Sequence, residues 1–572
     1  MTDALTIGVA QLATERTLGQ NLEKVICFIG QARVAGCRVA VFPEGALHGP
    51  DEMSKAEIDA AVESLCRAAA ENRLYVIAGL LYRLSDAEPL HNRLLVIDPD
   101  GHVVHTYDKL WGDSRFPNVP GPFRIDGISC CAIICADRWL RAVEELPVLA
   151  GAQIIFECSN NFDNEWIPDL GWYWYVPRAV RNGVYVVFCN TARERPGIVY
   201  AGRIWPGHGH SAVVAPDGRI VAAAGEEADR LLVAGLDLSQ ATRAEAIRRR
   251  HHPLLKQFWD VGIEIMGGAE LKAPPFQPLS APETSLTVAA AQIACTGNIE
   301  SNLERMGRMI GEAGAAGADI VALPELAVTG AQNEGIAAAD GALLAHALRQ
   351  IAEMARHRRV VIVFGMPCII EGKRYNSAYV INPAGELVTR YDQLVPDRPH
   401  LFAPGGSTRA MWFEVQGVPS VVTIGADALW SEIAELASVR GALVHVHLAH
   451  NRDTSEAAKL WRRQLWANLA SFRTLTVTVN AAAPAGGGSA IWEDYHRASS
   501  GAAGGWAPHS AVRLAEAKNG EQLLCITQVV PRENPHYARV TGRMNPQMKA
   551  WYAIGAEAIY TEKETSRWST GY

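Results

Sequence analysis

Short apolar runs alternate with longer amphipathic stretches along most of the chain. Residues 5–11 alternate between apolar and polar or small side chains, as a β-strand does. Residues 21–36 and 57–70 instead repeat their apolar positions with the period of a helix. Because strands and helices that follow each other in this order pack as layers, we expect an α/β fold.

Two predicted strands also follow each other without a helix between them. Residues 92–98 and 103–107 are separated by Pro99, Asp100 and Gly101, which are typical turn residues. This pair predicts an antiparallel hairpin. The sheets are therefore expected to be mixed rather than purely parallel.

The pattern occurs twice in the chain. Four segments of the first half recur in the same order 281 to 290 residues later (286 − 5 and 425 − 135). They are residues 5–11 with 286–292, 41–44 with 322–325, 107–109 with 391–393, and 135–137 with 425–427. Such long-period similarity predicts two copies of one domain.

The repeat also sets the expected domain boundaries. We expect a first domain at residues 1–265, a linker at 266–284, a second domain at 285–556 and a C-terminal tail at 557–572. The linker contains the proline-rich stretch 272–282, which lacks periodicity and is typical of an extended connection.

Composition narrows the class of protein. A chain of 572 residues exceeds what one core supports, and 49% hydrophobic with 20% charged residues is typical of globular domains. The net charge of −8 gives no general attraction to nucleic acid or to anionic membranes, so neither partner is expected. No segment approaches the roughly 20 uninterrupted apolar residues of a membrane helix.

Cysteine usage indicates the compartment. The 11 cysteines are an odd number and lie mostly in apolar runs, and residues 1–11 do not resemble an export signal. Both features predict a cytoplasmic protein with free thiols. Neither a zinc-type Cys or His spacing nor a Gly-rich phosphate loop is found, so no metal and no cofactor are expected.

Three reactive side chains of the first half stand where predicted strands end, which is where α/β folds open their clefts. Glu44 follows residues 39–43, Lys109 ends residues 103–109, and Cys135 follows residues 129–134. In a cleft, the carboxylate could move protons, the ammonium could stabilise an oxyanion and the thiol could act as a nucleophile. Taken singly, each has an ordinary alternative as a surface carboxylate, a solvated lysine or an inert core thiol. The last is expected of Cys130, Cys131, Cys158 and Cys189.

Six motifs in this order resemble the nitrilase superfamily of carbon-nitrogen hydrolases. They are residues 42–44, 107–110, 134–137, Ser159-Asn160, Arg178-Ala179 and 209–218. The resemblance covers nearly the whole chain, twice. It implies an αββα sandwich in each domain, two domains packed as an internal pseudo-dimer, further assembly into a homo-oligomer, and a catalytic triad of Glu44, Lys109 and Cys135.

The resemblance also implies a mechanism. Glu44 would serve as base and then as acid, and Cys135 would attack the substrate carbon. Lys109 and the backbone N–H of Ala136 would hold the oxyanion. Many members carry a second glutamate between the lysine and the cysteine. Residues 111–120 contain none, and Asp113 is the one carboxylate there.

The substrate class follows from the residues around Cys135. An aspartate two positions later, Asp137, resembles amidases and carbamoylases, whereas nitrilases typically place Trp-Glu after the cysteine. A small-molecule amide or N-carbamoyl compound is therefore expected. Arg138 resembles an arginine that binds the substrate carboxylate in N-carbamoyl amino acid hydrolases, and a structural ion pair is the alternative.

Further residues are expected to line the substrate pocket. They are Asn161, Trp166 and Trp172, and the aromatic run 166–175 could instead form a domain interface. Competing functions are hydrolysis of a nitrile, supply of ammonia by a glutaminase, and a non-catalytic scaffold or binding protein.

The second half lacks the chemistry of the first. Its counterparts of the triad are Glu325, Gln393 and Gly425, so it has no nucleophile and no ammonium group. We therefore expect a pseudoenzyme domain. Its expected role is that of a structural partner for the active domain, and a regulatory binding site is the alternative.

Overall fold

The computed structural model divides the chain into two compact units. The first comprises Met1–Lys272 with Gly542–Trp551, and the second Ala273–Thr541 with Tyr552–Tyr572. The structure describes residues 4–111, 119–161, 166, 168, 171–193, 198–200, 203–205, 207–227, 229–272, 275–451, 460, 463–464, 474–483, 486–494, 511–530, 532–534 and 545–561.

The first unit is built on two six-stranded sheets. One has the order β14-β1-β2-β3-β4-β5, with β1, β2 and β3 parallel and the other neighbours antiparallel. Its strands are β1 (Ala4–Gln11), β2 (Val39–Val41), β3 (Tyr75–Tyr82), β4 (His91–Ile97), β5 (Val103–Asp108) and β14 (Arg230–Asp237). The predicted hairpin is confirmed as β4 and β5.

The other sheet of this unit has the order β13-β12-β9-β8-β7-β6. Its strands are β6 (Phe123–Ile125), β7 (Ile128–Ile134), β8 (Ile154–Ser159), β9 (Tyr185–Asn190), β12 (Ala212–Val214) and β13 (Ile220–Ala223). Strand β1 packs against β9 and β4 against β7, so the two sheets face each other. A small hairpin of β10 (Ile198–Tyr200) and β11 (Arg203–Trp205) stands apart.

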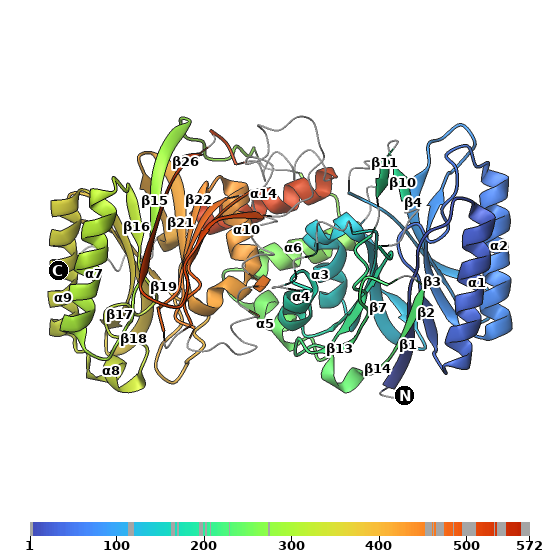
Figure 1. The fold of residues 1–572 in the computed structure, drawn as a ribbon, viewed down its shortest axis with the longest axis horizontal. Helices are drawn as coiled ribbons and strands as arrows, with labels where there is room; N and C mark the ends of the chain where they lie inside the picture. Colours follow the sequence, from blue (N-terminus) through green and yellow to red (C-terminus); the bar gives the residue numbers. More distant parts are fainter. Residues whose placement is uncertain are drawn as a thin grey trace. The chain divides into compact units, whose positions relative to one another are not determined.

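Helices cover the outer faces of this sandwich. Helices α1 and α2 lie on the first sheet, and α3 and α4 pack on β7 and β9 of the second (Figure 1). The described helices are α1 (Leu18–Val34), α2 (Lys55–Asn72), η1 (Cys135–Trp139), α3 (Arg141–Leu149), α4 (Tyr175–Asn182), η3 (Leu238–Gln240), α5 (Ala244–His251) and α6 (Lys256–Met266). The helices α1 and α2 confirm the two amphipathic stretches predicted from periodicity. Helix α2 begins with a capping box of Ser54 and Glu57, which satisfies its first free N–H groups.

The second unit repeats the two sheets. The first has the order β19-β18-β17-β16-β15-β26 and the second β20-β21-β22-β23-β24-β25. The strands are β15 (Thr284–Gln292), β16 (Ile320–Ala322), β17 (Val361–Ile370), β18 (Lys373–Ile381), β19 (Leu387–Asp392), β20 (Trp412–Val415), β21 (Val418–Ile424), β22 (Val444–Leu448), β23 (Leu475–Val479), β24 (Ala490–Asp494), β25 (Ala511–Glu516) and β26 (Gln522–Val530). Its helices are α7 (Ile299–Ala315), α8 (Asn333–Ala338), α9 (Gly341–Arg358), η4 (Arg409–Met411), η5 (Gly425–Leu429) and α10 (Ser431–Arg440). Helix α14 (Pro546–Thr561) belongs to the first unit up to Trp551 and to the second unit from Tyr552 on.

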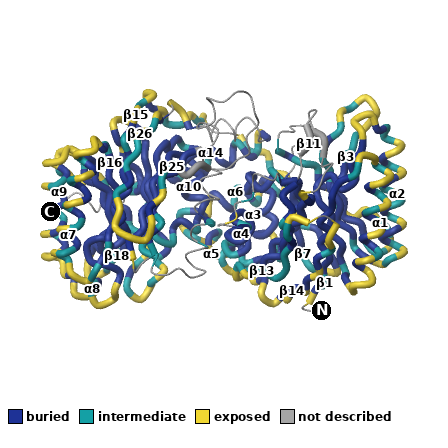
Figure 2. The backbone as a smooth tube through the Cα atoms, in the orientation of Figure 1, coloured by how far each residue is buried: buried dark blue, intermediate teal, exposed yellow. Residues whose placement is uncertain are grey.

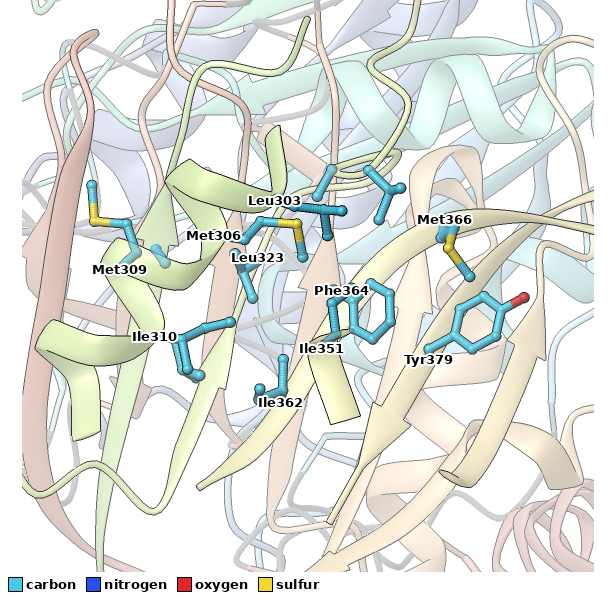
Figure 3. Packing of buried hydrophobic residues seen from close by; sticks show 14 of the residues in the cluster. Leu303, Met306, Met309, Ile310, Leu323, Ile351, Ile362, Phe364, Met366 and Tyr379 are labelled. Atoms are coloured by element: carbon cyan, nitrogen blue, oxygen red, sulfur yellow. The ribbon is translucent and has the colours of Figure 1, made fainter. Parts of the chain in front are cut away.

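The cores lie between the layers. In the second unit, Leu303 and Met306 of α7 and Ile351 of α9 pack on Ile362 and Phe364 of β17 (Figure 3). The central strands of the sheets are largely buried, whereas the edge strands β5, β14, β19 and β26 and the helices α1, α2, α7 and α9 have exposed positions (Figure 2). This packing explains why the strands read as nearly continuous apolar runs and the helices as amphipathic ones.

The predicted fold class is confirmed, since both halves are αββα sandwiches of the kind the resemblance implied. The domain boundaries at 265, 284 and 556, the internal pseudo-dimer and the homo-oligomer stay predictions. Helix α14 runs to Thr561, so it continues past the expected start of the tail. Within the described ranges, no helix combines the length and the apolar character needed to cross a membrane.

Candidate active site

Glu44 stands at the mouth of the first sheet. It comes three residues after β2 and is buried, with 6% of its surface exposed. The backbone N–H of Asn160, which follows β8 of the other sheet, donates to its Oε2 at 3.0 Å. The carboxylate is thus fixed between the carboxyl ends of strands from both sheets.

A glycine on β3 allows the chain to turn at Glu44. A β-carbon built on Gly79 would lie 2.7 Å from the carbonyl oxygen of Pro43 and 2.8 Å from Cα of Glu44. Real β-carbon contacts are longer than this, so only glycine fits without a shift of the backbone. The second unit repeats the feature, since a β-carbon on Gly365 would lie 2.5 Å from Cα of Glu325.

Lys109 forms a buried ion pair with Glu44. Its Nζ lies 2.7 Å from Oε1 of Glu44, and the two side chains are 17% and 8% exposed. Burial lowers the pKa of Lys109, whereas the nearby Glu44 carboxylate, Cys135 and Asp137 raise it. The negative groups together have the larger effect, so the net pKa is above the ordinary lysine value. The lysine therefore carries its charge at neutral pH.

Asp137 fixes the backbone around Lys109. Its carboxylate accepts hydrogen bonds from the hydroxyl of Tyr107 at 2.5 Å and from the backbone N–H groups of Leu110 at 3.4 Å and Trp111 at 2.7 Å. Burial raises the pKa of Asp137 to about 6, although Lys109 and these donors act in the opposite direction. Both sides of Lys109 are thereby tied to the segment that carries Cys135.

Cys135 begins η1 directly after β7, and its backbone is left-handed with φ of +48°. Such a conformation costs a non-glycine residue on the order of 1 kcal/mol, and it is common at functional turns. The side chain is partly exposed, whereas Cys130, Cys131, Cys158 and Cys189 are buried. Ala136 is the second residue of η1, where backbone N–H groups have no partner inside the helix.

Asn161 connects Cys135 to a network of polar side chains. Its Oδ1 accepts hydrogen bonds from the thiol of Cys135 at 3.4 Å and from Nη1 of Arg138 at 2.7 Å. Its Nδ2 donates a hydrogen bond to the hydroxyl of Tyr175 at 2.5 Å. The backbone N–H of Asn161 donates to Oδ1 of Asn190 at 2.8 Å. Both ends of its amide are therefore engaged.

Arg138 forms the ion pair that the sequence left open as its alternative role. Its Nη1 lies 3.2 Å from Oε1 of Glu157, and the two side chains are almost completely buried. Glu157 also accepts a hydrogen bond from Ser159 at 2.9 Å and pairs with Arg178. The binding of a substrate carboxylate by Arg138 stays a prediction.

Aromatic rings gather next to Asn161. Trp166 stacks on His210 with ring centroids 3.7 Å apart and meets Trp172 edge-on at 5.2 Å, and Nε1 of Trp172 donates to the carbonyl of His210 at 2.9 Å. The backbone N–H of His208 donates to the carbonyl of Asn161 at 2.8 Å. Burial lowers the pKa of His208 to about 3, so this ring is neutral.

Asp113, the predicted second carboxylate, lies outside the described residues. The sequence did not single out Gly79, Asn190, His208 or His210. Gly79 could have been found, because it recurs as Gly365 in the second half. Among the described residues, no group of three or more His, Cys, Asp or Glu side chains is arranged to hold a metal ion.

The second unit brings the counterparts of the triad together. A β-carbon built on Gly425 would lie 2.6 Å from Nε2 of Gln393 and 2.9 Å from Oε1 of Glu325. Gly425 is left-handed like Cys135, with φ of +56°, and begins η5 as Cys135 begins η1. The fold therefore places these three strand ends in contact, whichever side chains they carry.

Comparison with known proteins identifies the family of the chain. The family model described as carbon-nitrogen hydrolase matches residues 6–246 and 287–530. A 2-oxoglutaramate amidase of Bacillus subtilis is 24% identical over 207 residues, which are 33% of this chain and 73% of that protein. An omega-amidase of Bos taurus is 26% identical over 260 residues, which are 41% of this chain and 89% of that protein.

Solved structures are similar as well. An amidase of the nitrilase superfamily from Nesterenkonia matches 44% of this chain and 97% of its own, with 19% identity and a TM-score of 0.37. A carbon-nitrogen hydrolase from Helicobacter pylori matches 43% of this chain and 92% of its own, with 19% identity and a TM-score of 0.37.

Proposed function

The chain belongs to the carbon-nitrogen hydrolase family, and on that premise we propose that its first unit hydrolyses a small amide through a thioester on Cys135. The buried ion pair of Glu44 and Lys109 carries the proposal, because it sets a base and a fixed positive charge beside a partly exposed thiol. In this setting a thiol can be activated as a nucleophile.

The acylation step starts from the Glu44 carboxylate. Glu44 accepts the thiol proton, and the sulfur of Cys135 attacks the amide carbon to form a C–S bond and an oxyanion. The ammonium of Lys109 and the backbone N–H of Ala136 stabilise this charge. Glu44 then gives its proton to the amide nitrogen, the C–N bond breaks, and ammonia or an amine leaves.

The deacylation step uses the same groups. Glu44 accepts a proton from a water molecule, whose oxygen attacks the thioester carbon. The tetrahedral intermediate collapses, the C–S bond breaks, and the sulfur takes the proton back from Glu44 as the acid is released. The two hydrogen bonds that Glu44 accepts, from Lys109 and Asn160, hold its carboxylate in place for both steps.

The amide preference is supported by the relatives rather than by Asp137. The carboxylate of Asp137 accepts hydrogen bonds from Tyr107, Leu110 and Trp111. In the unit without a nucleophile, Asp427 accepts the three corresponding bonds from Tyr391, Leu394 and Val395. That pattern indicates a positioning role. The curated relatives, in contrast, are named as amidases.

The proposal is tested by ammonia release from a panel of small amides, N-carbamoyl compounds and nitriles. We expect turnover of at least one amide, and a loss of kcat of at least about 10³-fold in Cys135→Ala, because the nucleophile is removed. Cys66→Ala is the matched control, since that thiol has the same intermediate exposure.

Four outcomes would contradict the proposal. Wild-type turnover by Cys135→Ala would rule out the thioester mechanism. Turnover of nitriles alone would favour the nitrilase alternative, and N-carbamoyl compounds alone the carbamoylase alternative. Absence of turnover on the whole panel would favour a binding protein.

A further inference from the structure

A buried carboxylate of the first unit takes no part in the two steps proposed above. Glu157 lies on β8 opposite Ile133 of β7, and none of its surface is exposed. A carboxylate without access to water is costly unless hydrogen-bond donors surround it. Ser159 donates to its Oε1 at 2.9 Å, Arg138 pairs with the same oxygen, and Arg178 pairs with Oε2. These three donors fix the carboxylate in place.

Three hydrogen bonds lead from Glu157 to the sulfur of Cys135. Nη1 of Arg138 donates to Oε1 of Glu157 at 3.2 Å and to Oδ1 of Asn161 at 2.7 Å. The same Oδ1 accepts the hydrogen bond of the Cys135 thiol at 3.4 Å. Because Glu157, Arg138 and Asn161 are all buried, these contacts are made out of reach of bulk water, where a hydrogen bond is stronger than in water.

Arg138 decides which end of the Asn161 amide faces the sulfur. A guanidinium group has N–H donors and no acceptor, so the amide atom beside Nη1 must be the oxygen. Nδ2 is then on the other side, where it donates to the hydroxyl of Tyr175 at 2.5 Å. Glu157 holds the guanidinium that imposes this orientation. The carboxylate is thus linked to Cys135 through two side chains.

The second unit replaces three of these four residues. The counterparts lie 290 residues later (447 − 157), and the pairing of β7 with β8 and of β21 with β22 keeps this offset. Where the first unit has Glu157, Arg138 and Cys135, the second has His447, Ala428 and Gly425.

Asn161 alone has the same residue type at its counterpart, Asn451. The backbone N–H of Asn451 donates to Oδ1 of Asn480 at 2.9 Å, as that of Asn161 donates to Asn190 at 2.8 Å. Nδ2 of Asn451, however, is buried and has no hydrogen-bond partner among the described residues. The backbone bond is therefore kept in both units, whereas the fixed amide is lost together with the sulfur. This pattern favours a role for Glu157 in the chemistry of the first unit.

We propose that Glu157 is a positioning residue, which holds the thiol of Cys135 in one orientation through Arg138 and Asn161. In the resting site the S–H group donates to Asn161. A sulfur that is already oriented attacks the substrate carbon without a search among rotamers, so the effect falls on kcat. This kinetic consequence rests on the proposed thioester mechanism, whereas the contact of the thiol does not.

Infrared spectroscopy tests the contact without turnover. The S–H stretching band of Cys135 is the difference between the spectra of the wild type and of Cys135→Ala, and a hydrogen bond from the thiol lowers its frequency. Glu157→Leu is expected to move the band to higher frequency, because the oxygen of Asn161 is no longer held beside the sulfur. An unmoved band, or no Cys135 band in the wild type, would overturn the proposal.

Asn161→Asp provides a second variant of nearly the same shape, in case Glu157→Leu does not fold. It is expected to move the Cys135 band to lower frequency, since a carboxylate is a stronger acceptor than an amide oxygen. A band at the wild-type frequency would contradict the contact between Asn161 and the thiol. Circular dichroism and urea unfolding check that each variant is folded.

Steady-state kinetics test the positioning role. Glu157→Leu is expected to lower kcat by about 10-fold or more with little change in KM, because the orientation of the sulfur matters for attack and not for substrate binding. Glu157→Gln keeps an oxygen for Arg138 and is expected to restore most of kcat. A loss of kcat in Glu157→Gln as large as in Glu157→Leu would overturn the proposal.

Glu145→Leu is the matched control for the loss of a buried carboxylate. Glu145 is as buried as Glu157 but pairs with Arg141 and Arg249. Its loss is expected to lower the free energy of unfolding, with kcat and the Cys135 band unchanged. An equal loss of kcat in Glu145→Leu and Glu157→Leu would reduce Glu157 to a structural ion pair. If the wild type turns over no amide, the proposed function fails, while the S–H band still decides the contact.

Discussion

The hydroxyl of Tyr107 donates a hydrogen bond of 2.5 Å to the buried carboxylate of Asp137, and the same pair recurs as Tyr391 and Asp427 at 2.8 Å. In both units this bond ties the end of a strand in one sheet to the turn that follows a strand in the other. In the first unit it holds Lys109 next to the turn of Cys135. In the second it holds Gln393, which has no charge to position.

The first prediction concerns this tie. Tyr107→Phe removes one hydrogen bond to a buried acid group and should lower the free energy of unfolding by about 1–3 kcal/mol. It should also lower kcat more than it raises KM, because Lys109 acts on the oxyanion. Urea unfolding and steady-state kinetics measure the two effects. Tyr391→Phe is the matched control and should lose similar stability with no loss of kcat.

The second prediction concerns Gly79. Gly79→Ala would place a β-carbon 2.7 Å from the carbonyl oxygen of Pro43, so the backbone at Glu44 must move. Since small displacements of catalytic groups are costly, we expect at least a 10-fold loss of kcat. Gly30→Ala in α1 is the control, because nothing lies within 4 Å of its β-carbon, and it should stabilise the helix by up to about 1 kcal/mol. Equal kinetics in both variants would refute a positioning role for Gly79.

The third prediction separates the two roles considered for Arg138. Arg138→Ala leaves Glu157 without one of its buried partners, so the free energy of unfolding should fall by about 3–5 kcal/mol. Denaturant unfolding at fixed pH measures this change. If stability is instead unchanged and KM rises only for amides that carry a carboxylate, Arg138 is a substrate clamp.

The fourth prediction concerns pH and Glu325. Its pKa of about 7 lies above the ordinary value of 4.5, so the folded state binds more protons than the unfolded state between these values. The contribution of Glu325 to stability is therefore fully present below about pH 4.5 and is lost as the pH rises through 7. Glu325→Gln removes this ionisation. Its unfolding temperature, compared with the wild type, should rise steadily across that window, and a constant difference from pH 4.5 to 8 would contradict the shifted pKa.

The fifth prediction concerns thiol reactivity. Iodoacetamide should label Cys135 faster than Cys66, although both thiols have intermediate exposure, because only Cys135 lies beside a base and an ammonium group. Mass spectrometry of peptides over a time course measures the two rates. Lys109→Gln should reduce the difference. Equal rates in the wild type would argue against an activated thiol.

The sequence was sufficient to predict the layers and the strand-end residues of the site. The runs before Glu44 and Cys135 are apolar because β2 and β7 are largely buried, whereas β5 before Lys109 is an edge strand with exposed Val103 and Val104. The internal repeat gave each of these segments a counterpart in the second half with which it could be compared. It showed which positions the second half keeps, such as Asp427 for Asp137, and which it replaces, such as Gly425 for Cys135.

What the sequence could not supply is the identity of contacts between distant segments. Asp137 resembled a substrate determinant, and the sequence did not reveal its bonds to Leu110 and Trp111, which lie 27 and 26 positions away. The sequence left an ion pair open for Arg138 but did not name its partner, because Glu157 is brought next to it only by the pairing of β7 with β8. In the second unit, Gln393 and Glu325 lie against the position that a side chain at Gly425 would take, and a sequence pattern does not reveal how neighbouring side chains fill such a gap.

Replacing Gly425 by cysteine would not by itself rebuild the triad in the second unit. The new β-carbon would stand 2.6 Å from Nε2 of Gln393 and 2.9 Å from Oε1 of Glu325, so the ends of both flexible side chains would have to move aside. Gln393 carries no charge that could keep the new thiol ionised, and Nδ2 of Asn376 donates to Oε1 of Glu325. A single substitution at Gly425 would therefore supply a thiol without the ion pair that accompanies Cys135.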